Sequence, residues 1–441
     1  MRGPTVSTLK EIFHMKKKLI ALAVAGALAA PVVASAQGTN VTLFGRAQAE
    51  YSLVDFAGQP SQGALQDNSR SSRWGLQVTE DLGNGLKANA RLEFGLNTGS
   101  GSATTPREQW VGLSHSHWGD IRFGRLQSPF KDFAGGMTID PFAYTTLQAN
   151  GAGGTMSGAA NGMGSGANTF VNSAIRYDSA SIEGFTFSGI LMPGDANSLN
   201  PLQDGSLLSG FLPGGLGSNG NTGGRNGEFD GQAAAKYHAD FMGMGLDIFG
   251  GYSRDNANGI QKSIGLRTEE IWRVGASWAW ENFKLSGQYE DVNNALGAAT
   301  CSTAASLTAN PLDSGLVSGQ CNSAMNWGGD GNLWFASAQY RLGSTTLVAQ
   351  GGMTKAHAGG VNAAGSRKAD SFTVGAIHNL SKRTSLFGGY QHVYVTDNNP
   401  AGSGVNDLAP APGATVGYTA PNYVAPGSNR STFTIGLRHN F

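Results

Sequence analysis

The chain is short of charge, proline and cysteine. Only 14% of its 441 residues are charged, and proline occupies 15 positions. Because aromatic residues make up 9%, this is not the composition of a disordered, low-complexity chain. No apolar run of 18 or more residues follows Ala36, so the sequence predicts no transmembrane helix. That absence still allows a membrane location, since strands can also span a bilayer.

The two cysteines are Cys301 and Cys321, which lie in a stretch rich in Ser, Ala, Asn and Gly. In an oxidising compartment two lone cysteines this close are expected to pair, and the disulfide would staple one loop. Two free loop thiols are the alternative. No other soft ligand lies nearby in the sequence, which disfavours a metal site.

The N-terminus predicts export. From Met15, three lysines precede an apolar run that closes with Ala34-Ser35-Ala36, the small-x-small pattern that signal peptidase cleaves. We therefore assign 15–36 to a signal peptide and 1–14 to an upstream extension, which leaves 37–441 as one domain. Removing 1–36 takes away five basic residues and one acidic residue, so the net charge falls from zero to about −4. A mildly acidic exported chain is a poor candidate for nucleic-acid binding.

Glycine, by contrast, is abundant, with 66 positions, and it accompanies a pattern typical of strands. A helix-rich protein would rarely carry so much glycine, because glycine inside a helix costs about 1 kcal/mol relative to alanine. In the stretch LKANARLEFGLN (86–97), apolar residues alternate with polar ones, which gives a strand one apolar and one polar face. The same alternation recurs from VTLFGRAQAEY (41–51) to the terminal STFTIGLRHNF (431–441).

The connections between these runs also alternate. Short turns are expected at 83–85, 115–119, 240–244, 281–282, 342–344 and 381–383. Eight long segments rich in Gly, Asn and Ser are expected as loops at 56–72, 97–107, 126–170, 193–228, 254–268, 293–329, 355–368 and 397–429. Counting the runs gives about sixteen strands.

These features together predict a transmembrane antiparallel β-barrel of the all-β class, with about 16 strands, short periplasmic turns and long extracellular loops. In such a barrel the apolar face meets lipid and the polar face lines a wet lumen. Backbone groups cannot stay unpaired in lipid, so the sheet must close. About sixteen strands leave an aqueous channel rather than a filled interior.

Several stretches resemble the Gram-negative general porins, namely NVTLFGRA, SSRWGLQVTEDLGNGLKA, REQWVGLSHSHWGDIRFGR, IDPF and the terminal GLRHNF. The resemblance covers nearly all of 37–441. It implies a bacterial outer-membrane location and a trimeric barrel that passes ions and small hydrophilic solutes passively. It also implies that the third long loop, 126–170, folds into the lumen, and that Phe441 is the signal read by the outer-membrane assembly machinery. No cofactor is implied.

The resemblance further places basic wall residues opposite acidic residues of the third loop, which together form a pore constriction. By position, the wall residues are Arg46, Arg73 and Arg107, and the loop residues are Asp132 and Asp140. We add Arg91 and Arg125 from the direction in which their side chains should point. An arginine midway along a spanning strand would cost about 2–4 kcal/mol if it faced lipid, so it is expected to face the lumen. Pairing of these arginines with Glu50 and Glu93 is the simpler alternative. The basic residue expected before the sixth strand is replaced by Val171, and Arg176 is a candidate to take its place.

Other functions have less support in the sequence. His115 and His117 could ligate a metal, but no carboxylate pair or cysteine completes the set, so a polar turn is favoured. There is no G-x-S-x-G, H-E-x-x-H or phosphate-binding loop motif, which argues against an enzyme. Two alternatives remain. One is an outer-membrane barrel enzyme, such as a protease or lipase, and the other is a substrate-selective channel or an adhesin that uses its long loops.

Overall fold

The computed structural model describes most of the expected barrel domain. The described residues are 39–56, 61–66, 71–99, 101, 105–151, 154–156, 170–192, 230–256, 267–294, 330–357, 366–397 and 429–441. The expected upstream extension, the signal peptide and the expected disulfide of Cys301 and Cys321 lie outside these residues. Among the described residues, no helix is long and apolar enough to cross a membrane.

Antiparallel strands make up nearly all of the regular structure. They are β1 (Asn40–Phe56), β2 (Gln62–Gln66), β3 (Arg73–Gly83), β4 (Leu86–Gly95), β5 (Thr105–His115), β6 (Gly119–Gln127), β7 (Phe170–Asp178), β8 (Phe185–Met192), β9 (Asp230–Phe241), β10 (Met244–Asp255), β11 (Glu269–Trp280), β12 (Phe283–Asn293), β13 (Gly331–Leu342), β14 (Thr345–His357), β15 (Ser366–Asn379), β16 (Thr384–Asp397) and β17 (Asn429–Asn440). A short helix, α2 (Pro129–Asp132), and a 3-10 turn, η1 (Gly136–Thr138), follow β6.

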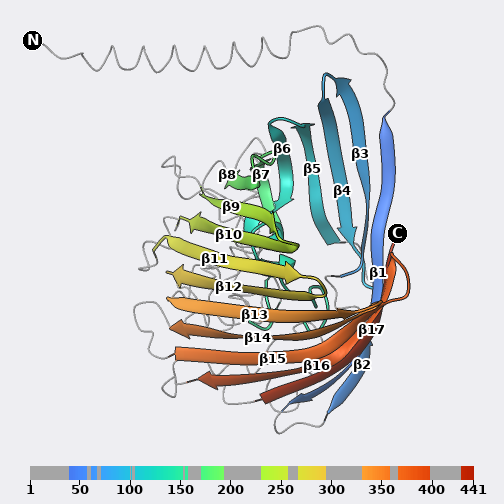
Figure 1. Cartoon of the computed structure of the whole chain (residues 1–441), viewed down its shortest axis with the longest axis vertical. Coiled ribbons are helices and arrows are strands. Elements are labelled where there is room, and N and C mark those ends of the chain that lie inside the picture. The colour runs from blue at the N-terminus through green and yellow to red at the C-terminus, as the bar shows by residue number, and fades with distance from the viewer. Residues whose placement is uncertain are drawn as a thin grey trace, which may run out of the picture.

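The sheet closes on itself, as the alternation predicts. From β3 to β17 consecutive strands pair in chain order, and β1 pairs with β17 from Arg46 to Phe56, which completes the ring (Figure 1). The expected loop 56–72 is wrong in one respect, because it contains β2. This short strand pairs with Glu50–Val54 of β1, whereas β3 pairs with Asn40–Arg46 of the same strand. Since β2 and β3 occupy successive halves of one edge, the barrel has sixteen positions around its circumference.

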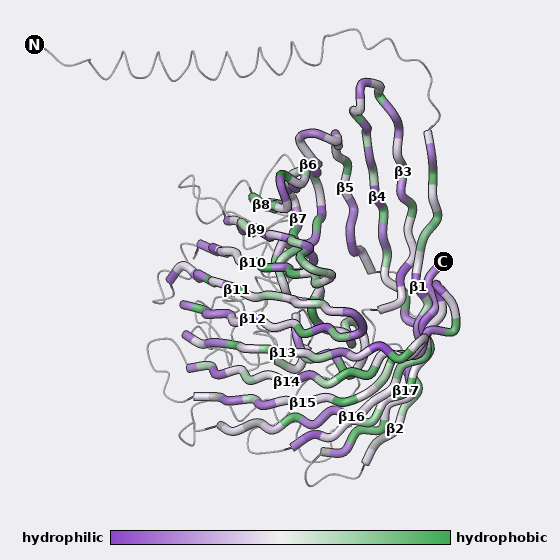
Figure 2. Tube along the Cα trace, in the orientation of Figure 1, coloured by the Kyte–Doolittle hydropathy of each residue, from purple (hydrophilic) through white to green (hydrophobic). Residues whose placement is uncertain are grey.

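Side-chain burial follows the predicted alternation. On β1, Val41 and Leu43 are 58% and 59% exposed on the outer face, whereas Gln48 and Glu50 are buried on the inner face. Figure 2 shows the same alternation of hydrophobic and hydrophilic positions along the strands. The apolar outer face and polar inner face have the reverse arrangement of a soluble β-protein, whose apolar face is buried in a core.

Tight turns at one end join the strands in pairs. At the turn between β3 and β4, Asn84 and Gly85 both have positive φ, 53° and 79°, as a two-residue type I′ turn requires. Asn-Gly is the pair that adopts this turn most readily, because both residues tolerate left-handed backbone. The structure adds one tight connection that the sequence analysis missed, at 179–184, where Ile182 bridges Phe185.

The segment between β6 and β7 packs inside the barrel against β9–β16. Phe130, Ile139 and Met156 of this segment share an apolar cluster with wall residues such as Phe249 and Phe335. Polar wall side chains hold its backbone along most of the described length. These bonds include Gln232 to the Phe130 amide (3.2 Å), Gln288 to the Gly136 amide (2.7 Å), Ser337 to the Ile139 carbonyl (3.0 Å), Gln391 to the Leu147 carbonyl (3.0 Å) and Thr354 to the Met156 carbonyl (2.7 Å). We call residues 128–156 the inner loop.

Two adjacent glycines of β10 provide a test of this packing. A Cβ on Gly251 would collide with the Phe130 ring and lie 2.8 Å from the Ala233 carbonyl oxygen, whereas a Cβ on Gly250 would meet only the Arg273 carbonyl oxygen at 3.2 Å. We expect Gly251→Ala to lower the free energy of unfolding by about 1–3 kcal/mol, since overpacking displaces α2. We expect the matched control Gly250→Ala to stay within about 0.5 kcal/mol. Denaturant unfolding in detergent measures both, and equal losses would contradict the packing.

Candidate functional site

Three of the predicted arginines converge on one ring of the inner loop. The Cζ atoms of Arg73, Arg46 and Arg107 lie 4.6, 5.4 and 5.9 Å from the ring centroid of Tyr144. They come from β3, β1 and β5, and their side chains extend from the inner face of the barrel to the same ring. A guanidinium within about 6 Å of an aromatic face is attracted by the ring quadrupole. The inner loop and the arginine-bearing wall therefore approach each other at Tyr144.

A β-bulge explains why β5 turns two adjacent charged residues inward. In the pairing of β4 with β5, Leu92 lies opposite Gln109 and Phe94 opposite Pro106, so that Glu93 alone faces both Arg107 and Glu108. Both of these residues are consequently buried, at 6% and 4% exposure. Bulges are frequent beside functional sites because they redirect a side chain in this way.

The bulge builds an ion-pair network around Glu93. Arg91 and Arg107 both donate to the Glu93 carboxylate, and Arg73 Nε lies 3.9 Å from Oε1 of the same group. Arg91 Nε also lies 3.1 Å from Oε2 of Glu108. The simpler alternative from the sequence, arginine pairing with Glu93, is therefore present in the structure.

A second aromatic ring, that of Phe170, also lies close to basic side chains. Arg107, Arg125 and Lys131 lie 4.9, 5.4 and 3.3 Å from the ring centroid of Phe170 at the start of β7. Arg125 also donates to Asn172, beside a second bulge at which β7 has one residue more than β6. Burial of Lys131 in the inner loop lowers its pKa well below the ordinary value, and the neighbouring Arg107 and Arg73 lower it further.

Arg438 of β17 belongs to the same wall. It donates from Nε to Gln48 (2.7 Å) and from Nη2 to the Ala143 carbonyl (2.9 Å). Glu50 beside it accepts the Thr146 amide at 3.1 Å. The inner loop is thus fixed on both sides of Tyr144 by groups of the wall.

The two predicted loop carboxylates lie apart from this cluster and bind elsewhere. Asp132 accepts a hydrogen bond from Arg176 Nη1 at 2.7 Å, and Arg176 also donates to the Gln127 carbonyl at 2.8 Å. The candidate substitute for the missing basic residue, Arg176, therefore ties the base of the inner loop to β7.

Asp140 folds the inner loop onto itself. Its Oδ1 accepts the Phe142 amide (2.8 Å), and its Oδ2 accepts the amides of Ala149 (2.8 Å) and Asn150 (2.7 Å). Burial raises the pKa of this carboxyl to about 6, although the hydrogen bonds from these amides oppose the shift. The Asp140 carboxylate therefore brings the two ends of the segment 140–150, which contains Tyr144, close together.

The local charge of this wall is positive. Arg46 donates to Asn440 (2.9 Å) and Arg438 to Gln48, so these two charges have neutral hydrogen-bond partners. The arginines around Tyr144, Glu93 and Phe170 are Arg46, Arg73, Arg91, Arg107, Arg125 and Arg438, and the glutamates beside them are Glu50, Glu93 and Glu108. Six arginines against three glutamates leave an excess of positive charge where the wall meets the inner loop.

Sequence reasoning missed part of this site. Tyr144 and Phe170 had no recognisable signal, because an aromatic residue in a loop marks no site by itself. Arg438 did have one, since it lies on the polar face of the last strand and pairs in register with Gln48.

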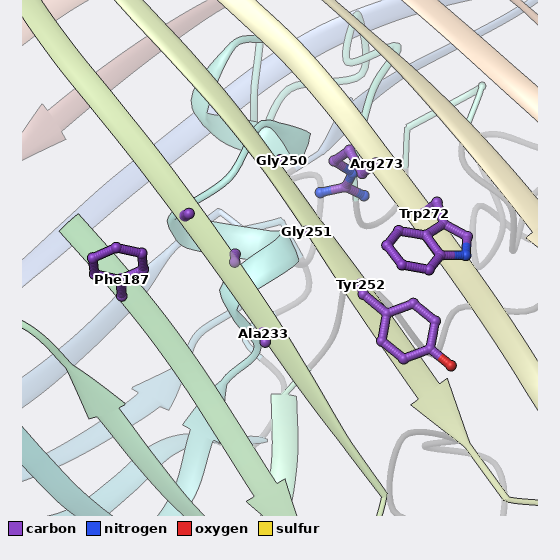
Figure 3. Close-up of a pocket in the computed structure, with 9 residues that line it drawn as sticks. Phe187, Ala233, Gly250, Gly251, Tyr252, Trp272 and Arg273 are labelled. Carbon is purple, nitrogen blue, oxygen red and sulfur yellow. The ribbon is translucent and has the colours of Figure 1, made fainter. Parts of the chain in front are cut away.

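A hollow on the outer face lies over strands other than those that carry the arginine cluster. It has a volume of about 330 Å³ and lies over β8–β11, where Ala233, Ala235 and Gly250 leave the wall thin. Figure 3 shows the Tyr252 and Trp272 rings side by side at its edge, with centroids 4.4 Å apart. Arg273, also in this view, donates instead to the Phe130 and Ala134 carbonyls of the inner loop.

At the β5–β6 turn both ring nitrogens of His115 have hydrogen-bond partners within the chain, Nε2 with the Asn84 carbonyl and Nδ1 with the His117 amide. His115 also stacks on Trp118, with ring centroids 5.7 Å apart. Within the part of the chain that the structure describes, no group of three His, Cys, Asp or Glu residues is placed to hold a metal ion.

A closed antiparallel barrel with an apolar outer face and a charged inner face defines a β-barrel membrane channel. Comparison with known proteins agrees: a family model for Gram-negative porins matches residues 21–398, and the chain belongs to that family.

Individual relatives are consistent with this assignment. The chain is 28% identical to outer membrane porin protein 32 of Delftia acidovorans over 97% of its own length and 100% of that protein. It is 33% identical to an outer membrane porin protein of Bordetella pertussis, over 39% of this chain and 47% of that protein. Among solved structures, an anion-selective porin from Comamonas acidovorans covers 92% of the chain at 21% identity and a TM-score of 0.57. OmpF of Salmonella typhi covers 92% at 14% identity and a TM-score of 0.55.

Proposed function

We propose that this porin forms a water-filled channel for the passive diffusion of ions and small hydrophilic solutes, and that it prefers anions. The constriction is the part of the lumen bordered by Tyr144 of the inner loop together with Arg46, Arg73 and Arg107 of the wall. The observation that carries the proposal is the convergence of these three guanidiniums on one ring, at 4.6 to 5.9 Å.

The electrostatics of a narrow water column explain the preference. Charged side chains that ring a pore bias the choice of ion, and their interaction with an ion is stronger where protein replaces bulk water. Arginine keeps its charge at any physiological pH, so an excess of arginine at the constriction attracts anions throughout that range. The solved porin from Comamonas acidovorans is itself described as anion-selective.

The remaining predicted constriction residues have supporting roles in this proposal. Arg91 and Arg125 extend the basic wall, where they are held by Glu93 and Asn172. Asp132 fixes the base of the inner loop by binding Arg176 of β7, and Asp140 fixes the fold of the inner loop by accepting its backbone amides.

The proposal includes the partners that the sequence predicts. The outer face is in contact with outer-membrane lipid, the assembly is a homotrimer, and the signal peptide is cleaved on export. In support of a trimer, OmpT of Vibrio cholerae, 14% identical with a TM-score of 0.50, has been solved in a trimer form. Phe441 pairs with Gly45 through two backbone hydrogen bonds and is 41% exposed, so its ring is accessible on the outer face.

Recording single channels of the refolded mature protein in a planar bilayer tests the channel itself. We expect stepwise conductance in groups of three, which polyethylene glycols small enough to enter the pore reduce. A correctly folded barrel without conductance would refute the diffusion channel and favour an adhesin.

A further inference from the structure

The backbone of Tyr144 is held in an unusual conformation from both directions. Its φ is +67°, a left-handed value that bulky residues rarely adopt. Its amide donates to Gln148 Oε1 (2.8 Å), and its carbonyl accepts Gln48 Nε2 (2.7 Å) from β1. These bonds fix the direction in which the ring leaves the inner loop. Such strain persists only where the surroundings over-determine it, and it is concentrated at functional positions.

The Tyr144 ring contacts three cationic side chains that repel one another. Arg46, Arg73 and Arg107 are like charges on three different strands, and Glu93 contacts two of them, Arg73 and Arg107. The negative face of an aromatic ring attracts guanidinium groups without neutralising them. A carboxylate at the same position would form an ion pair and cancel one positive charge.

Without the ring, these arginines have competing partners close by. Arg73 is already 3.9 Å from Glu93, and Arg46 already donates to Asn440. A side chain freed from Tyr144 can therefore fold back against the wall. That movement would widen the gap beside the inner loop and reduce the positive charge exposed there.

We propose that Tyr144 is the specificity-determining positioning residue of the constriction, whose ring holds the guanidiniums of Arg46, Arg73 and Arg107 together beside the inner loop. This role rests on the proposed function, since it assumes that the same gap conducts. It assigns the anion preference to the geometry of the arginines as well as to their number. It also explains why a strained aromatic residue occupies the position where the loop meets the wall.

The test compares variants that retain or lose the ring. Tyr144→Phe keeps the ring, whereas Tyr144→Leu removes it at similar bulk and with the same backbone strain. In bilayers with a salt gradient we expect Tyr144→Phe to keep the anion-to-cation permeability ratio of the native channel. We expect Tyr144→Leu to lower that ratio on the order of threefold, the scale of losing one cation–π contact, and to raise the conductance.

Different results would overturn the role of the Tyr144 ring and the proposed function. An unchanged ratio in Tyr144→Leu would overturn the proposal, as would an equal loss in Tyr144→Phe, which would implicate the hydroxyl rather than the ring. If Tyr144→Leu does not fold, Tyr144→Asn removes the ring with a residue that tolerates left-handed backbone. A native channel without anion preference would instead refute the proposed function, so the two failures are distinguishable.

Discussion

Replacing Arg46, Arg73 and Arg107 together with glutamine is expected to abolish the anion preference of the channel. The substitution removes three positive charges from the constriction and leaves three arginines against three glutamates. Glutamine is polar but uncharged, and the unchanged Gln48, Glu50 and Arg438 still hold the inner loop. Each charge contributes about 1–4 kcal/mol to an ion 4 Å away, depending on the local dielectric, so the permeability ratio should fall at least about tenfold.

A matched control removes the same net charge elsewhere. Arg341, Lys382 and Arg383 are exposed at the turn end of the barrel, at the end of β13 and between β15 and β16. We expect their joint replacement with glutamine to change the permeability ratio little, because these side chains are exposed and salt in the surrounding water screens their charge. Reversal potentials in a salt gradient compare the two triple variants. Equal shifts would mean that overall charge, rather than the constriction, sets the preference.

The second large effect is expected at Asp140. In Asp140→Asn the amide nitrogen replaces one of two oxygens that together accept three backbone amides, so at least one amide faces a donor. Leaving a buried amide without an acceptor costs about 1–3 kcal/mol. We therefore expect the variant to loosen the inner loop at neutral pH, with a lower unfolding temperature and noisier single-channel current than the native protein.

The contribution of Asp140 to the free energy of unfolding should depend on pH, because this carboxyl titrates. Its pKa is raised from 3.8 to about 6 by burial, so the folded protein binds this proton more tightly than the unfolded chain does. The contribution to stability is therefore fully present below about pH 3.8 and is lost as the pH rises through about 6. Two pKa units correspond to about 3 kcal/mol.

Comparison with the variant isolates this contribution. The asparagine that Asp140→Asn introduces cannot titrate, while every other group is shared by the two proteins. The difference in unfolding free energy between the native protein and the variant should therefore grow as the pH falls from 7 to 4. Denaturant unfolding in detergent at several pH values measures it. A difference that stays constant with pH would contradict the raised pKa of this carboxyl.

The barrel could be predicted from the sequence because the alternation is repeated on almost every strand. An outward arginine is costly in lipid, so facing alone places Arg46 and Arg91 inside. Tight turns such as Asn84-Gly85 are equally local, because they depend on the backbone freedom of two residues. The short strand β2 was missed because QGALQ is too brief and too polar to distinguish it from the surrounding loop.

The constriction itself was only partly predictable. A β-bulge at Glu93 depends on the register between two strands, and it alone explains why Arg107 and Glu108 both turn inward. The positions of Asp132 and Asp140 depend on how the inner loop folds, which no periodicity encodes. The resemblance to porins indicates acidic loop residues opposite a basic wall. In the structure Asp132 of the loop pairs with Arg176 of β7, and the Tyr144 ring, which no sequence signal marked, lies beside Arg73.

The most direct test of an arginine-dominated constriction is the zero-current potential of the native channel across a tenfold gradient of potassium chloride. We expect a potential whose sign shows chloride to be the more permeant ion, and whose magnitude falls as the ionic strength of both solutions is raised. A potential of the opposite sign would show that carboxylates control the narrowest part of the pore and would contradict the assignment of Arg46, Arg73 and Arg107.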